Sequence, residues 1–157
     1  MQLSPELKFA GAVGAQRRDY VNAPSRNFSG GVWNTDLTWR PRERSSVTLS
    51  GWRELRAWQD AESNHYVSRG VRVEPAWDSG FHWRLSLAAS WERDAYLDRS
   101  GASSREDTLK YVEAQLRYQF LKHLQLRLSG RTERRDSSNA AYDYDTRVAG
   151  AGIAASW

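Results

Sequence analysis

The chain has 157 residues, enough for one domain, and we expect 1–157 to form a single one. It has no run of about 20 apolar residues, which excludes a helical membrane protein but not a β-barrel, where only alternate residues face lipid. Its 23 basic and 19 acidic residues are interleaved, which argues against nucleic-acid binding, and without cysteine it has no disulfide or thiolate chemistry.

Eight segments alternate apolar and polar residues with a period of two, which is the pattern of strands with one apolar and one polar face. The clearest alternation lies in the fifth segment, where Trp83 and Leu85 flank Arg84. In the third segment Trp52 falls on the polar side, which predicts a bulge there. The predicted strands are 7–17, 28–40, 46–58, 66–77, 81–96, 108–120, 124–135 and 145–157.

The connections between these strands alternate in length. Short turns follow the even-numbered strands, at 41–45, 78–80 and 121–123, and long polar loops follow the odd-numbered ones, at 18–27, 59–65, 97–107 and 136–144. Outer-membrane barrels have short periplasmic turns and long extracellular loops. The sequence therefore predicts an all-β fold, an eight-stranded antiparallel up-and-down transmembrane β-barrel with both termini in the periplasm.

Aromatic residues gather where the predicted strands meet the short turns. Amphipathic rings favour the membrane interface, so we expect a periplasmic aromatic girdle. It would consist of Trp39, Trp77, Phe81, Trp83, Phe120 and Trp157.

Arginines interrupt the apolar face only toward the extracellular ends of the strands. A charge facing lipid costs about 2–4 kcal/mol at the midplane of the bilayer and little near the interface. Guanidinium groups there would meet the phosphates of lipopolysaccharide, which arginine binds bidentately, although plain solvated charges explain the pattern as well. The candidates for lipopolysaccharide contact are Arg17, Arg53, Arg69, Arg93, Arg134 and Arg147.

The polar face is rich in charges of both signs. Eight strands enclose an interior just wide enough for side chains, so we expect a lumen-facing charge network that plugs the barrel. In a wider barrel the same residues would line an ion-selective pore. The network would consist of Lys8, Asp36, Glu54, Arg56, Arg72, Glu74, Arg84, Glu92, Lys110, Glu113, Arg117, Arg127, Arg131 and Glu133.

Several stretches resemble the β-barrel porins associated with exopolysaccharide systems, often called EpsL-type outer-membrane barrels. The shared features are WRP before the TLS strand, the hairpin RYQFLKHLQL and the tract AYDYD before the last strand. The resemblance covers about 28–157 and implies an outer-membrane location, a role in polysaccharide export and the export machinery as partner. Members of the family are usually longer and end on Phe, so this chain would be a small member or the terminal part of a wider barrel.

Two other classes of protein remain open. An enzyme would need a site such as His65 with Asp60 and Ser63, but one such group in a polar loop is common by chance. We therefore expect no catalysis, and neither cofactor nor metal. A soluble ligand-binding barrel would have its apolar face inside, but the Gly and Ala on that face would fill a core poorly.

The expected location is the Gram-negative outer membrane. The first residues, MQLSPELK, include neither the basic nor the apolar stretch of a signal peptide, so we expect a mature or engineered chain. The expected partners are outer-membrane lipid and lipopolysaccharide, with no nucleic acid. A monomer is favoured, and a dimer that shares one wider barrel is the alternative.

Overall fold

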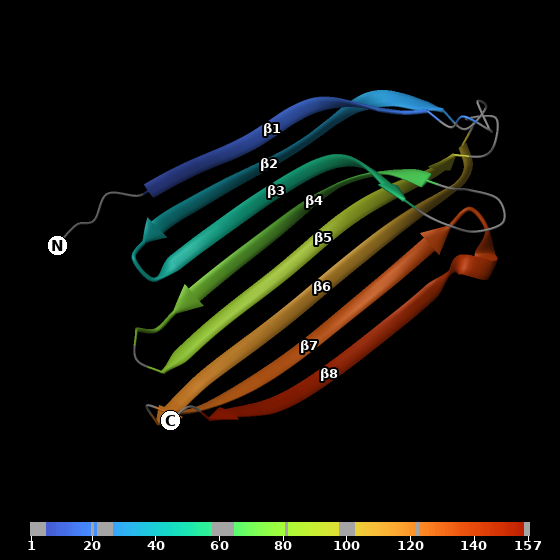
Figure 1. The fold of residues 1–157 in the computed structure, drawn as a ribbon. Coiled ribbons are helices and arrows are strands. Elements are labelled where there is room, and N and C mark those ends of the chain that lie inside the picture. The colour runs from blue at the N-terminus through green and yellow to red at the C-terminus, as the bar shows by residue number, and fades with distance from the viewer. Residues whose placement is uncertain are drawn as a thin grey trace.

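The computed structural model describes residues 6–19, 21, 27–57, 65–80, 82–97, 103–121 and 123–155. It shows one antiparallel sheet of eight strands that lie side by side in chain order (Figure 1). This confirms the predicted all-β, up-and-down arrangement. The strands are β1 (Glu6–Arg18), β2 (Phe28–Arg42), β3 (Ser45–Ala57), β4 (His65–Asp78), β5 (Trp83–Leu97), β6 (Ser103–Leu121), β7 (Leu124–Ser137) and β8 (Tyr144–Ala155), and a 3-10 turn, η2 (Ala140–Tyr142), precedes β8.

The connections divide the sheet into two rims. The loop rim carries the β1–β2, β3–β4, β5–β6 and β7–β8 connections, and the turn rim carries the shorter β2–β3, β4–β5 and β6–β7 connections (Figure 1). At the turn rim, Arg44 donates from Nη1 to the Ser79 carbonyl oxygen at 2.7 Å, and Gly80 adopts a positive φ of 78°. A Cβ at Gly80 would also meet the Arg44 guanidinium, but the end of that flexible side chain can move, so the positive φ is what requires glycine in this turn.

Strand β6 is longer than the sequence predicts. It begins at Ser103 rather than at 108, so much of the predicted 97–107 loop is strand. This outer part is polar on both faces, and a pattern based on apolar alternation cannot detect it. Pairing with its neighbours supports it instead, since Arg105 lies opposite Tyr96 and Asp107 lies opposite both Asp94 and Ser137.

The bulge predicted at Trp52 is wrong. The β3–β4 register is regular there, and Trp52 lies directly opposite Gly70. Because Gly70 has no side chain, the indole fits on the polar face over it, and its Nε1 donates to Ser68 Oγ at 3.2 Å. The register shifts lie instead near the rims, between Trp39 and Arg42, at Tyr96–Leu97 and between Gln119 and Leu121.

The strands are strongly staggered. One row of directly opposite residues begins at Phe9, near the turn rim of β1, and ends at Arg147, near the loop rim of β8; it runs through Phe9, Leu37, Leu49, Val73, Ala89, Val112, Thr132 and Arg147. Such a stagger is what tilted strands of a barrel require. Among the described residues, β1 pairs only with β2 and β8 only with β7, so the sheet has two edges here.

In the part of the chain that the structure describes, no helix has the length and apolar character needed to cross a membrane.

Candidate functional site

The register separates the side chains into a polar and an apolar face. All of the predicted network residues except Lys110 lie on the polar face, and they come from strands β1 to β7. Lys110 was assigned to this face wrongly. It lies opposite Trp91 and Arg134 on the apolar face, because its even position in β6 shares the side of Val112 and Leu116. Its ammonium group pairs with Asp136 at 3.3 Å.

Ion pairs and hydrogen bonds connect the middle of the polar face. Arg56 on β3 reaches across β4 to Glu92 on β5, with 2.9 Å between Nη1 and Oε1, and also contacts Glu54 at 3.2 Å. Arg72 pairs with Glu74 at 2.8 Å. Other carboxylates of this region accept hydrogen bonds from neutral hydroxyl groups. Ser50 donates to Asp36 at 2.6 Å. The Tyr111 hydroxyl donates to Glu113, and the Tyr144 hydroxyl donates to Glu133. The middle of the face therefore carries a mutually compensated network rather than isolated charges.

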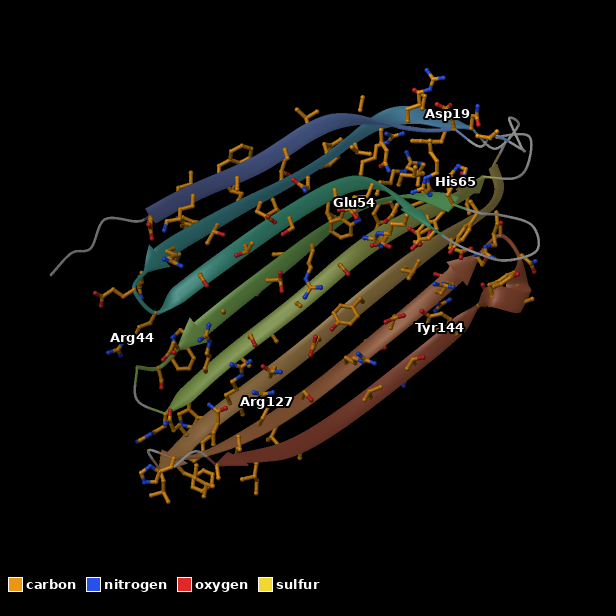
Figure 2. All side chains as sticks on the ribbon, in the orientation of Figure 1. Asp19, Arg44, Glu54, His65, Arg127 and Tyr144 are labelled. Carbon is orange, nitrogen blue, oxygen red and sulfur yellow. The ribbon has the colours of Figure 1, made fainter. Side chains whose placement is uncertain are left out.

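Three arginines gather on this face nearer the turn rim, with Asp78 on β4 directly opposite the first of them. Arg84, Arg117 and Arg127 occupy directly opposite positions on β5, β6 and β7. Arg117 donates to the Gln115 amide oxygen at 2.8 Å, and within the described residues none of the three forms an ion pair. Figure 2 shows Arg127 on β7 in this part of the sheet. Like charges in adjacent positions repel, so this arginine row on the polar face favours the presence of an anion.

A buried cluster at the loop rim was missed by the sequence analysis. Ser68, Asp94, Tyr96, Arg105 and Asp107, from β4, β5 and β6, are all buried. The Arg105 guanidinium lies between the rings of Tyr96 and Tyr142, at 3.6 and 3.8 Å from their centroids, and Arg105 Nε is 3.2 Å from Asp107. Asp107 also accepts from Ser137 Oγ at 2.5 Å. The alternation of Arg105 and Asp107 was the available signal, but both lay in a predicted loop.

These contacts attach the connection before β8 to the sheet. Ser138 N donates to the Glu106 carbonyl oxygen at 2.8 Å, and the Glu106 backbone amide donates to the side-chain Oγ of Ser138 at 3.0 Å. Asn139 caps η2 by accepting from the Ala141 amide at 3.1 Å. This connection is thus held closely against the end of β6.

The residues considered for catalysis do not form a described site. His65 begins β4, is buried, and makes an edge contact with the Phe28 ring at 5.8 Å between centroids. Asp60 and Ser63 lie outside the described residues. Over the described ranges, no group of three or more His, Asp or Glu side chains has the arrangement of a metal site.

The apolar face carries most of the exposed large hydrophobic residues, and Val148, 44% exposed on the polar side of β8, is an exception. Phe9, Val13 and Ile153 on the apolar face are 70%, 89% and 71% exposed. Of the predicted girdle, Trp39, Trp77 and Trp83 lie on this face near the turn rim, and the Phe120 ring stacks on Tyr118 of this face at 6.0 Å between centroids. Phe81 and Trp157 lie outside the described residues. Trp83 stacks on Tyr118 at 4.1 Å between centroids.

The six arginines considered for lipopolysaccharide contact also lie on the apolar face, toward the loop rim. They are not equivalent. Three of them pair with a carboxylate two residues away: Arg17 with Asp19 at 2.8 Å, Arg134 with Asp136 at 2.8 Å and Arg147 with Asp145 at 3.4 Å. The other three, Arg53, Arg69 and Arg93, form one cross-strand row. Figure 2 places Asp19 and His65 at this rim, opposite the end at which Arg44 lies.

The family described as "Putative beta-barrel porin 2" matches residues 1–156. No curated protein matches, and neither does any solved structure. The family description does not mention exopolysaccharide, so the EpsL-type association and the export role stay predictions from the sequence. An all-β sheet of eight up-and-down strands with faces of opposite polarity agrees with the family match, and the chain belongs to this family of β-barrel porins.

Proposed function

We propose that the chain forms a porin-like β-barrel in a Gram-negative outer membrane, with the apolar face toward lipid and the polar face toward the interior. The observation that carries this proposal is the segregation of apolar and charged side chains onto opposite faces of the sheet. Large apolar side chains such as Phe9 and Ile153 lie 70% and 71% exposed on the apolar face, and ion pairs such as Arg56–Glu92 and Arg72–Glu74 lie on the polar face. A soluble ligand-binding barrel would bury its apolar face instead.

In lipid the two free edges of the sheet need partners. Each unsatisfied backbone group costs several kcal/mol in the hydrocarbon region, and membrane sheets are therefore closed. We propose that β1 pairs with β8 of the same chain. The stagger from Phe9 to Arg147 supports this, because it gives the strands the tilt that a closed barrel needs.

The interior of this closed barrel is filled by the network on the polar face. Eight strands leave room for little more than side chains, and Arg56 alone extends over the width of β4 to reach Glu92. The barrel then acts as a structural or transport-related component of the outer membrane, without catalysis and without a permanently open pore.

The test is refolding into detergent micelles followed by gel electrophoresis in SDS with and without boiling. We expect a band at monomer mass whose mobility changes on boiling, and no stable large conductance steps after insertion into planar bilayers. A chain that folds and stays soluble without detergent contradicts the membrane proposal. A heat-modifiable band accompanied by large, stable steps contradicts only the filled interior.

A second candidate function follows from the arginine row on the polar face. If two copies share a wider barrel, Arg84, Arg117 and Arg127 line its lumen and select for anions, because rings of basic side chains favour anion passage. The measurement is the reversal potential in a salt gradient. We expect chloride preference that weakens on Arg117→Gln, and cation preference would exclude this candidate.

A further inference from the structure

The row Arg53–Arg69–Arg93 brings three like charges together on the apolar face. Arg69 on β4 lies directly opposite Arg53 on β3 and Arg93 on β5. Directly opposite residues have their Cβ atoms about 5 Å apart, and like charges in such positions destabilise a sheet. The row therefore has an electrostatic cost that a bound anion would remove.

No described carboxylate forms an ion pair with this row, although Glu106 lies on the same face, two positions from the Thr108 that is opposite Arg93. Arg53 donates from Nη1 to the Gly31 carbonyl, and Arg93 lies over the Trp91 ring, with its Cζ 5.9 Å from the centroid. None of the three forms an ion pair with a described acidic residue, and the Arg93 Nε is buried without an acceptor. Arg17, Arg134 and Arg147, on the same face and toward the same rim, each have an aspartate. Among the described residues, the lack of an ion pair therefore distinguishes these three arginines from the other three.

We propose that Arg53, Arg69 and Arg93 bind the phosphate groups of a phosphorylated glycolipid of the outer leaflet. This inference rests on the proposed membrane location, which puts the loop rim at the headgroup level. Arginine suits the role because its planar guanidinium binds phosphate oxygens in pairs and is only weakly hydrated. Three guanidinium groups from adjacent strands present one concentrated positive surface to the ligand.

The apolar residues next to the row identify the ligand as a lipid rather than free phosphate. Val71 and Trp91 occupy the adjacent positions toward the turn rim and are 52% and 42% exposed, and Leu49 and Val73 continue the apolar surface beyond them. An amphiphile whose phosphates contact the arginines can lay its acyl chains along these side chains. Inorganic phosphate would use the arginines alone and gain nothing from this surface.

The experiment measures binding of lipopolysaccharide to the full chain refolded in detergent, by change in tryptophan fluorescence or by calorimetry. The variants are Arg69→Gln, the triple change of Arg53, Arg69 and Arg93 to Gln, and Arg147→Gln as the matched control. We expect Arg69→Gln to weaken binding about tenfold, since one charge-assisted contact is lost. The triple variant should lose specific binding, and Arg147→Gln should bind as the unmodified chain does.

A stability measurement provides a second readout that a merely structural role would not give. Without lipopolysaccharide, Arg69→Gln should unfold at the same or a higher urea concentration, because repulsion is relieved. With lipopolysaccharide, the order should reverse, because only the unmodified chain gains from full binding.

The outcomes separate the possible failures. Unchanged binding in the triple variant, or an equal loss in Arg147→Gln, overturns the site. Competition by millimolar inorganic phosphate, or equal binding of dephosphorylated lipopolysaccharide, overturns the assignment to a lipid phosphate. A chain that gives no heat-modifiable band contradicts the proposed function, whereas a heat-modifiable band with unchanged binding in the triple variant contradicts the site alone.

Discussion

At the scale of single residues, Gly70 determines how the polar face packs. A Cβ built at this position would lie 2.5 Å from Trp52 Cζ2 and 2.7 Å from the Trp91 backbone carbonyl oxygen. Contacts this short with a packed indole and a neighbouring strand cannot be relieved by moving one flexible side chain. We expect Gly70→Ala to destabilise the protein by about 1–3 kcal/mol, the usual cost of overpacking, as measured by urea unfolding in micelles.

Gly130→Ala is the matched control for that experiment. Gly130 lies on β7, which is paired on both sides, and nothing lies within 4 Å of a Cβ built there. The same substitution should leave stability unchanged or raise it by about 0.4–1 kcal/mol through the unfolded chain. If both variants lost equal stability, the close packing of Trp52 over Gly70 would not be the cause.

At the scale of whole elements, the sequence predicted those strands in which apolar and polar residues clearly alternate. Strands β4, β5 and β7 have clearly alternating apolar and polar positions. Their existence, the direction in which each face points and their approximate boundaries therefore followed from the sequence. The outer part of β6 could not be predicted in this way, because its residues are polar on both faces. The residues that support it, such as Tyr96 and Ser137, lie on the neighbouring strands β5 and β7. Lys110 was misplaced because, as a charged residue, it was assigned by chemistry rather than by position.

The Arg105 contact makes that part of β6 testable. Arg105→Ala removes a cation between two aromatic rings, each contact worth about 1–2 kcal/mol when desolvated, and leaves the buried Asp107 with fewer partners. The connection around η2 should then open more often. We expect chymotrypsin to cleave near Tyr142 at least tenfold faster in refolded protein.

Two further variants serve as an intermediate case and as a control for Arg105→Ala. Arg105→Lys keeps the charge but not the planar group, so it should lie between the unmodified chain and Arg105→Ala. Arg134→Ala, which removes an exposed arginine on neighbouring β7, should leave cleavage near Tyr142 unchanged. Equal cleavage rates in the unmodified chain and in Arg105→Ala would mean that other contacts hold this connection.

At the scale of the whole molecule, the open question is what pairs with the edges of β1 and β8. The chain has no cysteine, so introduced pairs can be cross-linked without competition. We would place one cysteine at Val13 in the middle of β1 and a second at Ala149, Ala151 or Ile153 on β8. These three positions lie on the apolar face, as Val13 does, and they are two residues apart. They cover the alternative registers of β1 against β8, because only a shift by an even number of residues keeps a side chain on the same face.

Closure within one chain predicts that one of these three pairs forms a disulfide at monomer mass after oxidation of the refolded protein. Val13 paired with a cysteine at Gly150 or Gly152 should not cross-link, because those positions face the other side of the sheet. A disulfide-linked dimer would instead mean that two copies share one wall, in which case the arginine row on the polar face would line an open lumen. If the protein is heat-modifiable but forms neither product, β1 and β8 pair with strands other than each other. That result would contradict the proposed closed eight-stranded barrel.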